Sequence, residues 1–105
     1  MSRLVIRRRA DRDIDEQLIF LANQSHSLAA KFLDSIERTL HLITESPDRG
    51  FLWDDETHHE REIRVRAVVG FSNVLVFYRT AELAVEIIRV LHGARDIVTL
   101  LGNEF

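Results

Sequence analysis

The spacing of apolar residues changes along this chain, and each spacing predicts a different kind of element. Residues 3 to 6, RLVI, are β-branched and bounded by charge, which predicts a strand. From Ile14 onward, apolar residues fall at the i, i+4, i+7 and i+8 positions of one helix face, so we predict a helix over residues 9 to 24. A second helix is predicted from residue 27 or 28 to about residue 45, before Pro47.

From residue 61 the period becomes two, which is typical of strands. Residues 51 to 60 are an acidic stretch and are expected to form a loop. In REIRVRAVV, residues 61 to 69, the apolar residues point to one side and Arg64 and Arg66 to the other, which predicts a strand with one wet face. Residues 73 to 79 read as a central strand, and residues 84 to 92 as a last one.

The predicted order is therefore strand, helix, helix and three strands in an antiparallel meander. This β-α-α-β-β-β order predicts an α+β fold, with two layers in which an α-helical hairpin packs on a small antiparallel sheet. Residues 1 to 105 are expected to form a single domain. The residues after 96 are expected to give no more than a helical turn and a tail.

Composition restricts the chemistry that is open to the protein. There is no cysteine, so the sequence offers neither a disulfide nor a thiolate ligand or nucleophile. The five histidines form no H-x-x-x-H pair, and the four glycines form no phosphate-binding loop. We therefore expect no metal and no cofactor. The first apolar stretch has three residues and no segment reaches the length of a membrane span, so a soluble intracellular protein is expected.

The charge of −3 is unevenly distributed. Residues 1 to 12 carry five arginines and one aspartate, whereas residues 13 to 60 carry three basic and eleven acidic groups. Thirteen of the fourteen basic residues are arginine, the side chain that makes forked contacts with carboxylate or phosphate. A pI near 5.9 nevertheless disfavours a dedicated nucleic-acid-binding protein.

Metal-free cleavage of RNA is the enzymatic reaction that the remaining residues could support, because it needs an acid, a base and cations around the phosphate. The last three strands supply candidates: Arg64, Arg66, Tyr78, Arg79, Arg89, His92 and Arg95. The simpler interpretation is that alternating arginines form a solvated face and that His92 is a hydrogen-bonded residue at a strand end. Gly93 is interpreted as a turn position with positive φ, and Arg95 and Asp96 are expected to pair with other groups rather than with each other.

The stretches FYR (77 to 79) and EIIRVLHGARDI (86 to 97) resemble the RelE/ParE toxin superfamily of bacterial type II toxin–antitoxin systems, and most closely its ParE, or plasmid-stabilisation, branch. The resemblance extends to the helical hairpin, to Pro47 and Gly50 in a Pro-x-x-Gly turn, and to Gly70 before Phe71. It implies a growth-inhibiting toxin of the bacterial cytoplasm, bound by a cognate, ParD-like antitoxin in a hetero-oligomer, with no membrane and no small-molecule substrate.

Three functions follow from this resemblance. A ParE-like protein would bind and inhibit DNA gyrase without chemistry, and the near absence of lysine favours this hypothesis. A RelE-like protein would cut mRNA on the ribosome, with His92 or Tyr78 as acid or base and Arg64, Arg66 and Arg95 as phosphate clamps. An inert relative would only bind its antitoxin. For the binding hypotheses, the candidate contact residues are Arg64, Arg66, Arg79, Arg89, His92, Arg95 and Asp96.

Overall fold

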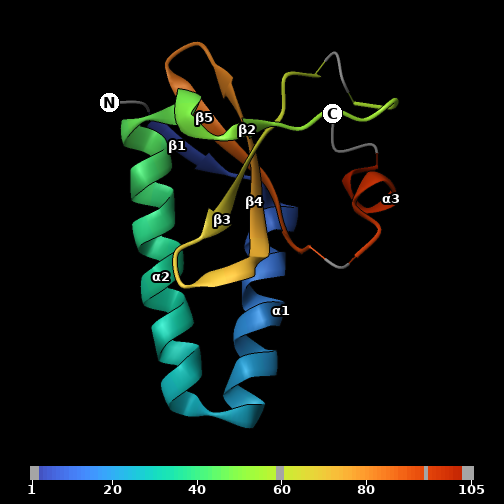
Figure 1. Ribbon diagram of the computed structural model, residues 1–105. Helices are drawn as coiled ribbons and strands as arrows, with labels where there is room; N and C mark the ends of the chain where they lie inside the picture. Colours follow the sequence, from blue (N-terminus) through green and yellow to red (C-terminus); the bar gives the residue numbers. More distant parts are fainter. Residues whose placement is uncertain (1–2, 59–60, 94, 103–105) are drawn as a thin grey trace.

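The computed structural model describes residues 3–58, 61–93 and 95–102, and it has one mixed sheet with helices on both of its faces (Figure 1). The first part of the chain forms β1 (Arg3–Ile6), α1 (Arg8–Gln24) and α2 (His26–Glu45). After the short 3-10 helix η1 (Pro47–Arg49), the chain forms β2 (Phe51–Leu52), β3 (Arg64–Val68), β4 (Phe71–Ala81), β5 (Ala84–His92) and α3 (Ile97–Leu101).

The five strands lie in the order β1-β5-β4-β3-β2. The predicted antiparallel meander is present as β3, β4 and β5, but β1 joins it parallel to β5, with Leu4 opposite Val85 and Ile6 opposite Ile87. The sheet is therefore mixed rather than antiparallel throughout. The acidic loop also contributes a two-residue edge strand, β2, which the sequence did not predict.

The α1–α2 hairpin covers one face of the sheet, here called the inner face (Figure 1). Ser25 separates the two helices and caps the second, because its hydroxyl oxygen accepts a hydrogen bond of 3.2 Å from the backbone N–H of Leu28. The inner core joins the apolar stripes of both helices to the strands, and its fully buried members include Phe32, Ile43 and Val76. This is the helix-on-sheet layer that the sequence predicted.

The opposite, outer face of the sheet is covered as well, which the predicted two-layer architecture did not include. A second core forms there from Phe77 and Ile88 of the sheet together with Ile97 and Leu101 of α3. Trp53 closes it, with its indole ring edge-on to Phe77 at a centroid distance of 5.5 Å. Residues that were expected to be a loop and a tail therefore supply a cover for the outer face.

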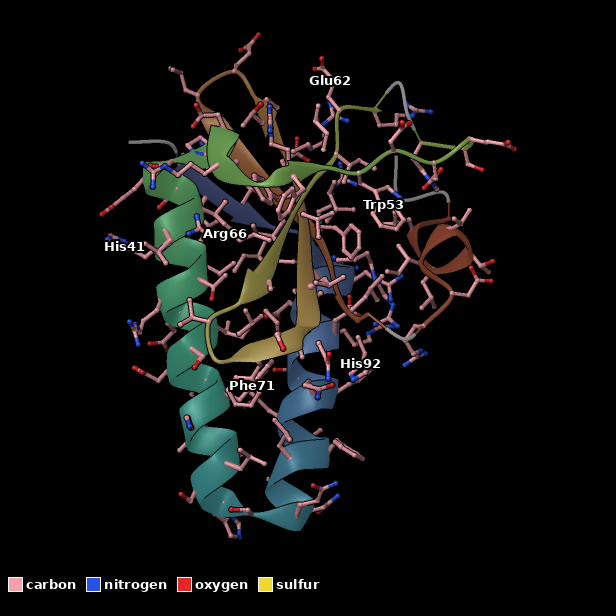
Figure 2. The ribbon with its side chains drawn as sticks, viewed as in Figure 1. His41, Trp53, Glu62, Arg66, Phe71 and His92 are labelled. Atoms are coloured by element: carbon pink, nitrogen blue, oxygen red, sulfur yellow. The ribbon has the colours of Figure 1, made fainter. Side chains whose placement is uncertain are left out.

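Arg64 and Arg66 alternate with apolar residues as predicted, but the face they occupy is the inner one. Val65 belongs to the outer core, so its two neighbours point toward the side of the helical hairpin. Nη1 of Arg64 donates hydrogen bonds to the carbonyl oxygens of Gly50, at 2.9 Å, and Asp48, at 3.2 Å. Arg66 lies beside α2 (Figure 2). The two arginines are half-buried rather than part of a solvated face.

The interpretation of Gly93 as a residue with positive φ is wrong. Among the described glycines, positive φ occurs at Gly70, in the turn between β3 and β4, and at Gly102. The backbone N–H of Gly93 instead donates a hydrogen bond of 2.6 Å to the carbonyl oxygen of Asn73, which extends the pairing of β5 with β4. No helix in the described part of the chain is long and apolar enough to cross a membrane.

Candidate functional site

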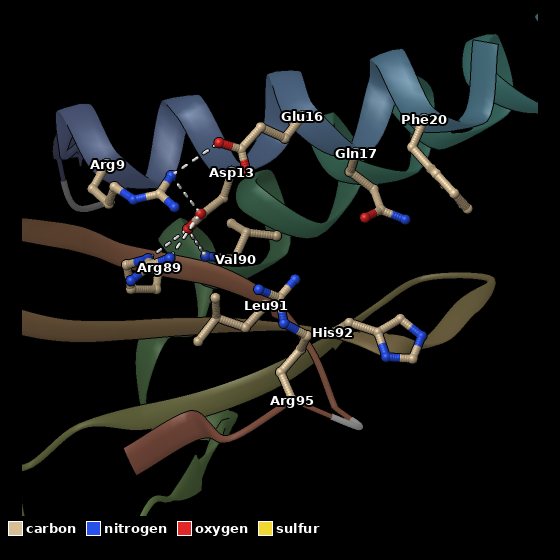
Figure 3. Close-up of a pocket in the computed structure, with 10 residues that line it drawn as sticks. All are labelled: Arg9, Asp13, Glu16, Gln17, Phe20, Arg89, Val90, Leu91, His92 and Arg95. Carbon is tan, nitrogen blue, oxygen red and sulfur yellow. Dashed lines mark hydrogen bonds and ion pairs between the residues drawn. The ribbon is translucent and has the colours of Figure 1, made fainter. Parts of the chain in front are cut away.

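A groove of about 380 Å³ runs between α1 and the part of β5 that lies beyond its pairing with β1 (Figure 3). We call it the α1–β5 groove. One wall consists of residues from a single side of α1: Arg9, Asp13, Glu16, Gln17 and Phe20. The other wall is formed by the end of β5 and the residue that follows the turn: Arg89, Val90, Leu91, His92 and Arg95.

The groove exists because β1 is shorter than the strand it pairs with. The last pair between them joins Ile6 and Ile87, so the remainder of β5 has no strand on that side. A β-bulge follows immediately, since Phe77 pairs with Arg89 and Tyr78 with Ile87, which leaves Ile88 as the extra residue. α1, rather than a strand, therefore lies along this stretch of β5.

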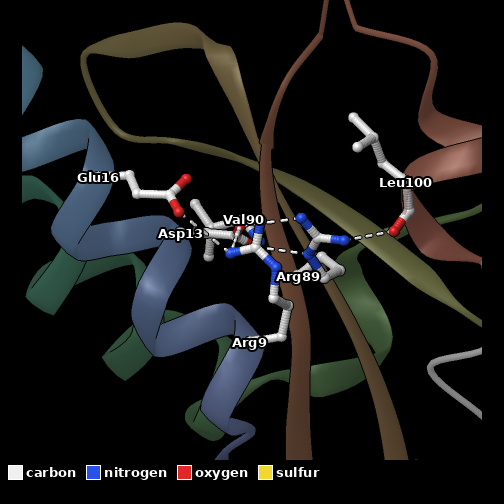
Figure 4. A network of polar contacts seen from close by, with 6 residues as sticks. All are labelled: Arg9, Asp13, Glu16, Arg89, Val90 and Leu100. Carbon is white, nitrogen blue, oxygen red and sulfur yellow. Dashed lines mark hydrogen bonds and ion pairs between the residues drawn. The ribbon is translucent and has the colours of Figure 1, made fainter.

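Asp13 joins the two walls of the groove (Figure 4). Its carboxylate accepts hydrogen bonds from Nε of Arg89, at 2.7 Å, from Nη2 of Arg89, at 2.9 Å, and from the backbone N–H of Val90, at 3.0 Å. Nη1 of Arg9 forms an ion pair with the same carboxylate at 2.9 Å. Asp13 is 6 % exposed and Arg89 is 4 % exposed, so this is a buried ion pair whose donors and acceptors satisfy each other.

The guanidinium of Arg89 also reaches the outer face, where Nη1 donates to the carbonyl oxygen of Leu100 in α3. Arg89 thus connects α1, β5 and α3. Its charge is balanced by Asp13, so its role is to hold elements together rather than to present a cation to a partner.

The groups that remain accessible in the groove lie at its other end. His92 and Arg95 are exposed, and Phe20 is 57 % exposed although it is aromatic. The three side chains come from β5, from the turn after it and from α1, and they border the same groove (Figure 3). Together they offer an aromatic surface next to positive charge, an arrangement suited to binding a peptide with acidic and apolar side chains.

Tyr78 lies in a different part of the fold and is fully buried. Its hydroxyl donates a hydrogen bond of 2.7 Å to the carbonyl oxygen of Pro47 and accepts one of 3.0 Å from the backbone N–H of Gly50. Burial raises the pKa of Tyr78 above its ordinary value, against the lowering effect of the Gly50 hydrogen bond and of the charge on Arg64. The two hydrogen bonds of this hydroxyl hold the turn that follows α2.

The residues suggested for RNA cleavage are not gathered in one place. His92 pairs with Val74, four residues before Tyr78 on the same strand, which corresponds to roughly 13 Å along β4. Arg64 and Arg66 lie near Tyr78, on the inner face, whereas Arg95 lies near His92. The structure thus divides the predicted set into a buried Tyr78 group and an accessible His92 group.

Arg79 and Asp96 belong to neither group. Arg79 stands opposite Glu86, whose carboxylate accepts hydrogen bonds from Nε and Nη2 of Arg7. Asp96 caps α3, because its carboxylate accepts hydrogen bonds from the backbone N–H of Thr99, at 3.3 Å, and from its hydroxyl, at 2.7 Å. Asp96 thus pairs with another group and not with Arg95, as expected, but its role is local.

The pairing of Asp13 with Arg89 was not predicted from the sequence, because Asp13 is one of several acids in the first turns of a helix. The sequence did contain a signal from the other member of the pair. Arg89 interrupts the apolar residues 87 to 91, and a charge in a buried strand needs a partner. The sequence contains seventeen acidic residues that could have supplied it, so the partner could not be identified without the fold.

The α1–β5 groove is lined by two acids, the buried Asp13 and the exposed Glu16. Its one buried carboxylate is saturated by arginine and by a backbone N–H, so it is not placed to act as a general base. Among the described residues there is no group of three or more His, Cys, Asp or Glu side chains that could hold a metal ion.

Comparison with known proteins agrees with this fold. No curated protein matches the chain. Residues 4–97, however, match the model of a family described as the ParE toxin of the type II toxin–antitoxin system parDE. The matched region runs from β1 to the first residue of α3 and includes both walls of the α1–β5 groove. The chain belongs to the ParE toxin family, and it is therefore the toxin of a type II toxin–antitoxin pair whose partner is an antitoxin.

Proposed function

We propose that this protein inhibits bacterial growth by binding DNA gyrase in the cytoplasm, without cleaving a bond, and that a ParD-like antitoxin neutralises it. The observation that supports the proposal is that the outer face of the sheet is covered. A nuclease would need an open face lined with cations, but here Trp53 and α3 pack onto Phe77 and Ile88 instead. Membership of the ParE family supports the same function.

The location of Tyr78 further favours binding over RNA cleavage. An acid or base must come within hydrogen-bond reach of the atom it serves. The hydroxyl of Tyr78 is buried and held by Pro47 and Gly50, and the raised pKa of Tyr78 disfavours its use as a base near neutral pH. His92 is accessible, and it lines the groove together with Gln17, Phe20 and Arg95.

We assign the antitoxin to the α1–β5 groove. The groove has exposed side chains on both of its walls, so a segment of a partner could lie in it between α1 and the end of β5. Exposed Phe20 offers an apolar contact, and Arg95 offers a charge for an acidic side chain. His92 lies between them.

A supercoiling assay tests the proposed target. Purified protein is titrated into a mixture of DNA gyrase and relaxed plasmid. We expect supercoiling to stop as the protein is added and to resume when purified antitoxin is added afterwards. Full supercoiling at every excess of the protein would overturn the gyrase proposal. Growth that is unaffected by expression without the antitoxin would instead identify an inert relative.

Mapping of transcript ends after induction tests the alternative. A RelE-like ribonuclease would produce cuts that appear with the parent protein and vanish in His92→Ala. Under our proposal, transcripts stay intact both in the strain that expresses the parent protein and in the strain that expresses His92→Ala. Cleavage by the purified protein, alone or with ribosomes, would contradict the proposal directly.

The antitoxin surface is tested by charge reversal. The protein is co-purified with the polypeptide encoded next to its gene, and Arg95→Glu is compared with Arg12→Glu. Both arginines are exposed, but Arg12 does not line the groove. We expect Arg95→Glu to weaken the complex about tenfold or more and Arg12→Glu to leave it unchanged, because only Arg95 faces the assigned segment. Equal effects would place the antitoxin elsewhere.

A further inference from the structure

A second cavity, of about 320 Å³, adjoins the α1–β5 groove. Gln17 of α1 and His92 of β5 line both cavities, and Figure 3 shows them on opposite walls of the groove. The rest of the second cavity is lined by residues 70 to 74, which belong to the β3–β4 turn and to the start of β4. We call this cavity the β4 pocket. A chain that lies in the groove reaches the β4 pocket between Gln17 and His92.

The β4 pocket exists because β4 is irregular at its start. The register of β4 against β3 shifts between Ala67 and Val68, so residues 72 to 74 of β4 have no opposite residue on β3. A bulge of this kind bends the strand and redirects its side chains. The carbonyl oxygen of Asn73 accepts a hydrogen bond of 2.6 Å from the backbone N–H of Gly93. The backbone that carries the pocket is therefore anchored to the residue that follows β5.

The β4 pocket differs from the groove in its charge. The groove is lined by three arginines and two acids. The described residues that line the β4 pocket include no arginine, lysine, aspartate or glutamate, and His92 is shared with the groove. A charged group that entered this pocket would lose contact with water without gaining an ion pair of its own. The pocket is therefore suited to an uncharged group.

Three polar side chains of the β4 pocket are available for hydrogen bonds with a partner. They are the carboxamides of Gln17 and Asn73 and the hydroxyl of Ser72. In the described part of the chain, none of these three side chains forms a hydrogen bond with another residue. Each of them carries both a donor and an acceptor. A carboxamide on the partner combines the two functions in one group, so it complements this lining.

We propose that the β4 pocket receives the carboxamide side chain of an asparagine or a glutamine of the antitoxin, in the part of the antitoxin that continues from the α1–β5 groove. The inference rests on the assignment of the antitoxin to that groove. An antitoxin with a charged or an apolar residue at this position leaves the polar groups of the pocket without partners, so it binds less tightly. The β4 pocket thus contributes to discrimination between antitoxins.

Asn73→Asp tests the pocket with little change in side-chain size. The dissociation constant of the complex with purified antitoxin is measured by isothermal titration calorimetry. We expect Asn73→Asp to weaken the complex about tenfold or more, because an amide donor is replaced by a negative charge in a pocket without a compensating cation. Urea denaturation checks that the variant folds, which we expect because the side chain of Asn73 is exposed.

Asn23→Asp is the matched control, because Asn23 is exposed on α1 and lines neither cavity. It should bind the antitoxin as tightly as the parent does. Equal weakening in Asn23→Asp and Asn73→Asp would overturn the proposal, since the effect would then come from the added charge and not from the pocket.

A second measurement identifies the antitoxin residue. Each asparagine and glutamine of the antitoxin is changed to alanine, and each variant is measured against the parent toxin and against Asn73→Ala. We expect one antitoxin variant to bind the parent toxin about tenfold more weakly and to lose little more with Asn73→Ala, because both substitutions remove the same contact. Additive losses for every antitoxin variant would overturn the proposal, even if Asn73→Asp failed to fold.

Arg95→Glu separates this proposal from the assignment on which it rests. Weaker binding in Arg95→Glu with unchanged binding in Asn73→Asp would overturn the role of the β4 pocket and leave the groove assignment in place. Unchanged binding in both variants would overturn the groove assignment as well. None of these measurements involves gyrase, so their outcome is independent of the proposed target.

Discussion

Asp13 of α1 and Arg89 of β5 form a forked, buried ion pair, although 76 residues separate them in the sequence. The pair closes a contact between the helical hairpin and the sheet at the β-bulge, where regular pairing with β1 has ended. Because the carboxylate also accepts the backbone N–H of Val90, the same side chain satisfies a donor that the strand ladder leaves over.

We predict that Asp13→Ala lowers the free energy of unfolding by about 3 to 5 kcal/mol, since it leaves the Arg89 charge buried without its carboxylate. Urea denaturation followed by circular dichroism measures the change. Glu16→Ala is the control: it removes an exposed carboxylate that lies 3.5 Å from Arg9, and it should cost less than about 1 kcal/mol. Equal losses in the two variants would mean that the buried pair contributes no more than a surface pair.

We predict that Tyr78→Phe lowers the free energy of unfolding by about 1 to 3 kcal/mol at neutral pH, because the backbone N–H of Gly50 and the carbonyl of Pro47 lose their partner. The ring itself is retained, so the loss reports the hydroxyl alone. An unchanged urea midpoint would show that these hydrogen bonds contribute nothing net.

Alkaline pH should destabilise the parent protein through the same residue. Burial raises the pKa of Tyr78 above its ordinary value of about 10, so the unfolded chain loses this proton at lower pH than the folded chain does. The contribution of Tyr78 to the free energy of unfolding is therefore fully present below about pH 10. It is lost as the pH rises through the pKa that Tyr78 has in the folded protein. Unfolding measured between about pH 9 and pH 11 should show a steeper decline in the parent than in Tyr78→Phe.

The two turn glycines should respond differently to alanine. Gly70 has φ of 79°, a conformation that L-residues rarely adopt, so Gly70→Ala should cost about 1 kcal/mol. At Gly93 a Cβ would lie 3.5 Å from the carbonyl oxygen of Asn73, which is ordinary contact, so Gly93→Ala should stay within about 0.5 kcal/mol of the parent. Thermal denaturation of both variants measures this, and a larger loss at Gly93 would contradict the backbone argument.

Periodicity predicted the elements whose burial is one-sided. β1 and β5 have the predicted bounds, and α1 begins one residue before the predicted start, because their apolar residues repeat with the period of the element. Periodicity could not predict which side of β3 faces the helices. Alternation places Arg64 and Arg66 on one side, but both sides of this sheet are covered, so the apolar side was no guide to the hairpin.

The candidate site was harder to predict from the sequence than the fold. His92 and Arg95 were expected to lie near each other because they are three residues apart in the sequence, and both line the groove. Their opposite wall, from Arg9 to Phe20, comes from a helix near the other end of the chain, and no local pattern indicates that approach. The contact between Nε2 of His58 and the carbonyl oxygen of Gly102, at 3.1 Å, was also hidden, because a backbone carbonyl is a group that every residue carries.

The pairing of the first strand with the last has a consequence for how the toxin is made. β1 pairs with residues 84 to 87, so during synthesis it has no strand partner until those residues have emerged from the ribosome. Both walls of the α1–β5 groove are likewise complete only when residue 95 has emerged. A translation product that stops in the β4–β5 hairpin lacks the strand with which β1 pairs, so it cannot form the complete five-stranded sheet.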